Sequence, residues 1–152
     1  MNRDIPLTTP GTRPLPRPHR NILIVGDENQ YRGVMEALLK EEGYTVSTCR
    51  SSGEVLRLIR NQSIGFVILE QSSGELGVLQ FLGEIKEIEW GMPVLVILYQ
   101  YDLELYLAAK KLGALDVLAI PIDFEELRRN LNSHQATFPY AKHKYNIVLD
   151  DY

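Results

Sequence analysis

Two acidic residues of this chain stand just after short apolar runs, at positions where α/β proteins place their chemistry. Glu70 directly follows the run Phe66–Leu69, and Asp27 follows the run Ile22–Val25 after a single glycine, Gly26. A continuous apolar run of this length predicts a strand that is buried on both faces, as in a parallel sheet covered by helices. Ligands of such sheets bind beyond the carboxyl ends of the strands. The two carboxylates are therefore the first candidates for a functional site.

Few other residues of the sequence suggest catalysis. It contains no phosphate-binding glycine loop, no nucleophile elbow and no dinucleotide fingerprint. Cys49 is the single cysteine, which excludes an internal disulfide and agrees with a reducing cytoplasm. The three histidines, His19, His134 and His143, lack the spacing of metal ligands. The sequence therefore does not predict an enzyme.

Length and charge limit the kind of protein further. The 152 residues suffice for one domain with a core, and no apolar run is long enough to span a membrane. Four arginines against one aspartate give residues 1–20 a charge of +3, and the lysines and aspartates of residues 134–152 cancel. Because the whole chain carries −4, residues 21–133 carry −7. An acidic domain argues against a nucleic-acid-binding surface.

The pattern along the chain predicts three parts: a proline- and arginine-rich disordered leader (1–20), one domain (21–133) and a tail (134–152). Apolar runs predict strands at 21–25, 65–69, 94–98 and 115–120, and a short strand with Val46 facing inward is predicted at 44–49. Helical periodicity predicts helices from 31 to a stop at Gly43, from a Ser51 cap to about 60, over 75–88, over 102–112 with a stop at Gly113, and after an Asp123 cap.

Five strands alternating with five helices predict an α/β fold with a doubly wound, five-stranded parallel sheet in the flavodoxin-like order 2-1-3-4-5. This order makes the first, third and fourth strands central. It would place Gly26, Asp27, Glu70 and Leu98 around one crevice at the carboxyl edge of the sheet.

The order and spacing of several short segments resemble the receiver domain of bacterial response regulators, the CheY-like family. The segments that carry the resemblance are Ile22–Glu28, Glu42–Val46, the run ending at Glu70, Pro93–Val96, Gly113–Asp116 and Ile120–Asp123. The resemblance implies an acidic pair that binds Mg²⁺, an aspartate that accepts a phosphoryl group, a threonine or serine after the fourth strand and a lysine before a proline. It also implies a cis peptide bond between Ile120 and Pro121.

The sequence departs from this pattern at most of the functional positions. The acidic pair is reduced to Asp27 by a glycine, the nucleophile is a glutamate, and apolar residues replace the hydroxyl, the lysine and the aromatic switch. These departures are, in chain order, Gly26, Glu70, Leu98, Val117 and Ile120. Displacing a reacting group by about 1 Å can cost on the order of 10²-fold in rate. The resemblance thus implies a degenerate phosphorylation pocket in a pseudo-receiver that is not an efficient phosphoacceptor.

The predicted function is therefore phosphorylation-independent protein–protein interaction in bacterial signal transduction, with a protein partner or a second copy of the chain and no cofactor. The predicted helix 102–112 is apolar on more than one face, and its core side can be filled by Leu105, Ala108, Ala109 and Leu112. The remaining apolar residues form a candidate interaction surface, which comprises Tyr99, Leu103, Tyr106 and Val117. Plain core packing by a tilted helix is the competing interpretation of the helix residues.

Two alternative functions remain open at the level of sequence. Asp27 and Glu70 could bind Mg²⁺ in a residual phosphorelay acceptor, or the crevice could bind a small ligand, since Leu98 and Ile120 make it more apolar. Each carboxylate also has a structural explanation: Asp27 suits the start of a helix, and Glu70 can be a strand-end carboxylate rather than a mimic of phosphorylation. The aromatic tail could add a strand to a sheet edge or be disordered.

Overall fold

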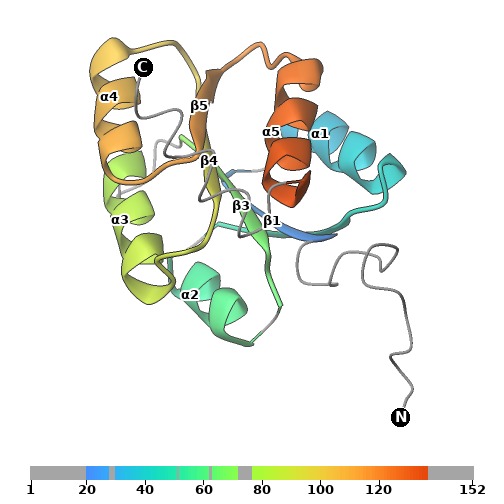
Figure 1. Ribbon diagram of the computed structural model, residues 1–152, viewed down its shortest axis with the longest axis horizontal. Coiled ribbons are helices and arrows are strands. Elements are labelled where there is room, and N and C mark those ends of the chain that lie inside the picture. The colour runs from blue at the N-terminus through green and yellow to red at the C-terminus, as the bar shows by residue number, and fades with distance from the viewer. Residues whose placement is uncertain (1–19, 28–29, 51, 62, 72–76, 137–152) are drawn as a thin grey trace.

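The protein forms a five-stranded parallel sheet with helices on both faces (Figure 1). The structure is a computed structural model that describes residues 20–27, 30–50, 52–61, 63–71 and 77–136. The strands are β1 (Asn21–Val25), β2 (Thr45–Cys49), β3 (Phe66–Glu70), β4 (Val94–Leu98) and β5 (Asp116–Ala119). The helices are α1 (Gln30–Glu41), α2 (Ser52–Asn61), α3 (Val78–Ile88), α4 (Leu103–Lys111) and α5 (Phe124–Ala136). The strand order β2-β1-β3-β4-β5 confirms the predicted fold.

Two layers of core explain why the central strands are continuously apolar. Side chains of β1 alternate between the two faces: Leu23 and Val25 pack under α2, α3 and α4, whereas Ile22 and Ile24 pack under α1 and α5. Every residue of β3 and β4 is buried. Burial on both faces leaves no solvent-facing positions for polar residues, which is the pattern of a helix-covered parallel sheet. Among the described residues, no helix is long and apolar enough to cross a membrane.

The predicted helix boundaries hold where local capping determines them. Gly43 and Gly113 adopt φ values of 96° and 103° and follow the ends of α1 and α4, which confirms the two predicted stops. The Asp102 carboxylate accepts a hydrogen bond from the Leu105 amide at 3.1 Å, and the Asp123 carboxylate accepts one from the Glu125 amide at 2.9 Å. The peptide bond between Ile120 and Pro121 is cis, as the resemblance implied.

Other boundaries differ from the prediction. The third helix was predicted from residue 75, but α3 begins at Val78 after the extended residue Gly77. β5 is shorter than the predicted 115–120, and α5 continues to Ala136, beyond the predicted domain end at 133. The predicted Ser51 cap, residues 1–19 of the leader and residues 137–152 of the tail lie outside the described residues.

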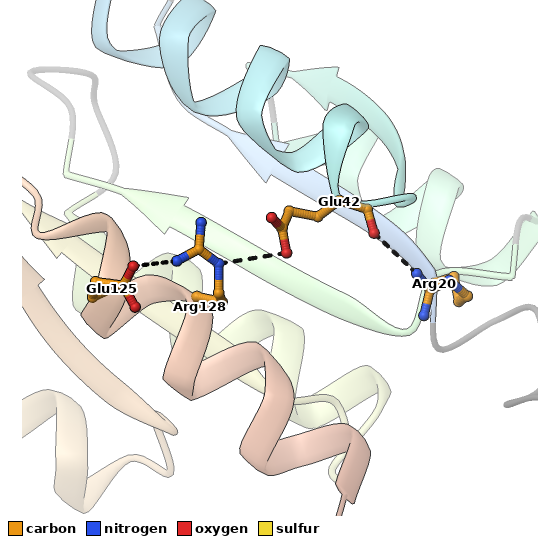
Figure 2. A network of polar contacts seen from close by, with 4 residues as sticks. All are labelled: Arg20, Glu42, Glu125 and Arg128. Atoms are coloured by element: carbon orange, nitrogen blue, oxygen red, sulfur yellow. Dashed lines mark hydrogen bonds and ion pairs between the residues drawn. The ribbon is translucent and has the colours of Figure 1, made fainter.

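A polar network joins three segments at the side of the sheet covered by α1 and α5 (Figure 2). The Arg128 guanidinium contacts Glu125 one turn earlier on α5 and lies 3.4 Å from the Glu42 carboxylate, which follows α1. Arg20, just before β1, donates to the Glu42 carbonyl at 3.2 Å and lies over the Tyr44 ring at 4.9 Å from its centroid. These exposed contacts add little stability individually but position the start of β1 beside the end of α1.

Candidate functional site: the carboxyl edge of the sheet

The register of the parallel strands brings the predicted pocket residues to one edge. Val25 pairs with Leu69, and Glu70 pairs with Ile97 on β4. The amide that follows β5, that of Ile120, donates to the Leu98 carbonyl at 2.9 Å. Gly26, Asp27, Glu70, Leu98 and Ile120 therefore follow or end neighbouring strands at the same edge, as the predicted topology requires.

Glu70 and Gly26 pack closely against each other at this edge of the sheet. The Glu70 side chain is only 4% exposed and is the one charged side chain that is buried in the described part of the chain. A Cβ atom built on Gly26 would lie 2.5 Å from Glu70 Oε1 and 2.8 Å from Glu70 Cβ. Real Cβ atoms do not approach other atoms this closely. The glutamate therefore occupies the space that a side chain at residue 26 would need.

Hydrogen bonds hold the Gly26 backbone on both sides. Its amide donates to the carbonyl of Cys49 at 3.0 Å, which continues the pairing of β1 with β2. Its carbonyl accepts a hydrogen bond from the Arg32 guanidinium, which reaches back from α1. Asp27 is exposed. Because the backbone is anchored in both directions, residue 26 has little freedom to move away from Glu70.

The neighbouring strand ends carry apolar residues, followed by one exposed tyrosine, Tyr99. Leu98 is 1% exposed and belongs to the core, while Ile120 is partly buried. The Tyr99 amide donates to the side-chain carbonyl of Gln71 at 3.0 Å, which connects the ends of β4 and β3. Partial burial and the negative charges of Asp27 and Glu70 raise the pKa of the Tyr99 hydroxyl. Tyr99, predicted as part of an interaction surface, thus also lies at this edge of the sheet.

The donor set at this edge of the sheet does not fit the divalent site that the family resemblance implies. Mg²⁺ requires near-octahedral oxygen ligation and is usually held by carboxylates together with waters. Here residue 26 has no side chain, Glu70 is packed against that glycine, and of the acidic residues that the structure describes at this edge Asp27 alone is exposed. Within the described residues, no three acidic, histidine or cysteine side chains form a group that could hold a metal ion. We therefore derive no chemistry through a bound metal.

The exposed face of α4 differs from the predicted interaction surface. Leu103 is exposed as predicted, but Tyr106 is partly buried against the core, and its ring lies 6.3 Å from that of Tyr101, centroid to centroid, at a tilt of 46°. Val117 is buried at 8% exposure, so its assignment to the surface was wrong. Leu107, which was not predicted, is 56% exposed.

Leu112, assigned to the core side of this helix, was also misplaced and is 39% exposed. The actual phase follows from the spacing of Leu105 and Ala109, which are four residues apart and face the core, so that Leu103 and Leu107 face solvent. The sequence contained this spacing, but it did not show which of two apolar stripes is covered.

The buried thiol of Cys49, next to Gly26, should make the free energy of unfolding depend on pH. Burial, with a smaller effect from the Glu54 charge, raises the pKa of its thiol from 9.0 to about 12. Above pH 9 the unfolded chain loses this proton while the folded chain keeps it, so the free energy of unfolding should fall between pH 9 and about 12. Urea unfolding should show a larger fall for the wild type than for Cys49→Ala. Equal pH profiles for the two proteins would contradict this prediction.

Comparisons with known proteins agree with this architecture. The family described as response regulator receiver domain matches residues 22–132. The transcriptional regulatory protein ZraR of Escherichia coli (strain K12) is 32% identical over 111 residues, which are 73% of this chain and 25% of that protein. The transcriptional regulatory protein GlrR of the same organism is 28% identical over 107 residues, 70% of this chain and 24% of that protein. The chain thus spans about a quarter of the length of these relatives.

Solved structures show the same fold. A receiver domain protein from Clostridium thermocellum superposes with a TM-score of 0.69 at 29% identity, covering 84% of this chain and 98% of that one. A CheY-like receiver domain protein from Methanospirillum hungatei JF-1 gives a TM-score of 0.67 at 21% identity over 77% of this chain and 97% of that one. The match over residues 22–132, together with the sheet order, shows that this chain belongs to the response regulator receiver domain family of two-component signalling.

Proposed function

We propose that this receiver domain transmits signals by protein–protein interaction that does not depend on phosphorylation, and that it is not an enzyme. The observation that carries the proposal is the packing of Glu70 against Gly26. The carboxylate at the phosphoacceptor position is buried, and it excludes a side chain from the neighbouring position of the acidic pair. A nucleophile in this position is poorly accessible to a phosphodonor.

The surroundings of Glu70 support the same proposal. Phosphoryl transfer depends on positioning and on groups that neutralise charge on the transferred phosphoryl group. Leu98 and Ile120 supply neither a hydrogen-bond donor nor a positive charge from their side chains. Losing one preorganised electrostatic partner costs roughly 10²–10³ in rate. Two such losses beside a buried glutamate favour a domain that its partner binds in one fixed conformation.

Incubation of the full chain with a small acyl phosphate and Mg²⁺ should leave its intact mass unchanged. An ordinary receiver domain treated in parallel should gain one phosphoryl group, which shows that the donor is active. The variants Glu70→Gln and Asp27→Asn serve as site controls. An adduct on the wild type that disappears with Glu70→Gln would overturn the proposal and would favour the residual phosphorelay acceptor.

The exposed face of α4 is the proposed docking surface. Tyr101, Leu103 and Leu107 are 61%, 56% and 56% exposed and lie near one another along the start of this helix. Exposed apolar clusters are typical of protein-interaction sites. The charge of −7 on residues 21–133 favours a protein over a nucleic acid as the partner. A solved receiver of the same fold is a beryllofluoride-activated dimer, so a second copy of the chain is one partner to test.

The double substitution Leu103→Glu and Leu107→Glu should abolish this docking without harming the fold. Both side chains are exposed, so the free energy of unfolding should change by no more than about 0.5 kcal/mol per site. Val34→Glu is a matched control, because Val34 is 52% exposed on α1, away from α4. Sedimentation should test self-association, and capture from extracts of the native cell should test other partners. A partner that the double variant retains would contradict docking on α4.

A further inference from the structure

Trp90, between α3 and β4, is the single tryptophan of the chain and is 76% exposed. It lines a shallow surface groove together with Gln80, Gly83, Glu84 and Glu87 of α3 and with Leu112, which follows α4. The Lys86 amine donates to the carbonyls of Trp90 at 3.3 Å and of Met92 at 2.7 Å, and it lies 5.7 Å from the indole centroid. The indole is therefore presented to solvent on a backbone that is held in place.

The lining of this groove has a specific chemistry. Trp90 and the exposed Leu112 offer an apolar platform, and Glu84 and Glu87 add two carboxylates beside it. The third charged lining residue, Lys86, has its amine engaged by two backbone carbonyls. Proline rings pack flat against aromatic side chains in extended segments, and arginines pair with carboxylates. The groove thus suits an extended proline-rich segment that carries arginines.

Such a segment is present in the same chain. Residues 10–19 contain four prolines, at positions 10, 14, 16 and 18, with Arg13 and Arg17 between them and no acidic residue. Proline-rich sequences favour the polyproline II conformation, which loses little entropy when it binds. The charge of this segment is opposite to that of the two lining glutamates.

The segment is within reach of the groove. Leu23 of β1 pairs with Val67 of β3, which pairs with Val94 of β4, so these three strands start at the same edge of the sheet. Arg20 lies three residues before Leu23, and Trp90 lies four residues before Val94. The starts of β1 and β4 are separated by two strand spacings, about 10 Å. A polyproline II segment of six residues covers roughly 19 Å, which exceeds the spacing between the starts of β1 and β4.

We propose that residues 10–19 of this chain dock in the groove at Trp90, with prolines against the indole and Arg13 and Arg17 beside Glu84 and Glu87. Neither Glu70 nor the exposed face of α4 takes part, so this inference is independent of the proposed function. Docking would cover the groove between α3 and the end of α4.

Fluorescence of the full chain tests this directly, because Trp90 is the only tryptophan. Acrylamide should quench Trp90 of the wild type less than Trp90 of the variant Arg13→Glu/Arg17→Glu. The loss of two exposed ion pairs should lower the docking equilibrium constant about fivefold. The variant Arg3→Glu/Lys142→Glu makes the same charge change outside the segment and should quench like the wild type. Combining Arg13→Glu/Arg17→Glu with Glu84→Lys/Glu87→Lys should restore protection.

Two other outcomes of the quenching experiment would contradict docking of residues 10–19 within one chain. Equal quenching of Trp90 in the wild type and in the Arg13→Glu/Arg17→Glu variant would overturn the proposal. This holds whether both are fully quenched or both stay protected by another occupant, such as the C-terminal tail. Protection that decreases on dilution would replace docking within one chain by docking of the leader of a second copy. No phosphodonor is present in these measurements, so their failure is separate from failure of the proposed function.

Discussion

Gly26→Asp, which restores the acidic pair of the receiver family, should destabilise this protein by about 1–3 kcal/mol. Its Cβ would lie 2.5 Å from Glu70 Oε1 and 2.8 Å from Glu70 Cβ, and the backbone is anchored by Cys49 and Arg32. A second carboxylate would also be placed beside Glu70, and like charges at this distance oppose each other's ionisation. Urea unfolding monitored by circular dichroism measures the effect.

Two further variants separate packing from charge. Gly26→Ala adds only the Cβ atom and should cost less than Gly26→Asp. In a Glu70→Ala background the contact with Oε1 is gone, while the Cβ of residue 70 remains, so the cost of Gly26→Ala should fall by about 0.5 kcal/mol or more. Equal costs of Gly26→Ala in both backgrounds would show that Glu70 does not restrict residue 26. A stable Gly26→Asp variant that gains thermal stability from Mg²⁺ would show an intact receiver site.

Leu98→Thr, which restores the family hydroxyl, should cost about 2–4 kcal/mol, in the range of buried leucine truncations. Leu98 is 1% exposed and belongs to the core under α2, α3 and α4. Threonine would remove apolar volume and bury a hydroxyl that needs a hydrogen-bond partner. Denaturant unfolding again provides the measurement, and the variant should also fail to accept a phosphoryl group from an acyl phosphate.

Leu98→Met is the matched control, because it nearly conserves volume and should cost less than about 1.5 kcal/mol. Ile120→Lys gives a second comparison, since Ile120 is only partly buried and a lysine amine there can extend to solvent. A Leu98→Thr variant as stable as Leu98→Met would mean that residue 98 lines an open pocket and does not pack as core. That result would favour the alternative in which the crevice binds a small ligand.

The residues at which this site departs from the family pattern depend on their surroundings for packing. Glu70 requires glycine at residue 26, and Leu98 has become part of the core. Single reversions toward the family pattern are therefore expected to cost stability before they can restore chemistry. This coupling agrees with the proposal that the domain acts through a surface, at α4, and not through phosphoryl transfer.

The sequence by itself determined the architecture and the place of the site. Apolar runs identified four of the five strands, and the mixed sequence of β2 was assigned from the inward residue Val46. Gly43 and Gly113 marked the ends of two helices, and short right-handed connections implied the order 2-1-3-4-5. From that order alone, Gly26, Glu70 and Leu98 were expected at one edge. These features could be predicted because periodicity and capping are local, and because the connection rules apply to any chain with these elements.

Only the tertiary structure decided how individual side chains are used. The packing of Glu70 on Gly26 depends on the distance between two strands, and the exposure of Leu107 in place of Tyr106 depends on the rotation of α4 about its own axis. Val117 is buried because β5 packs beneath its neighbouring helices, and Trp90 is exposed because the groove beside α3 leaves it uncovered. Contacts between segments remote in sequence set these distances and rotations, and no local pattern encodes them.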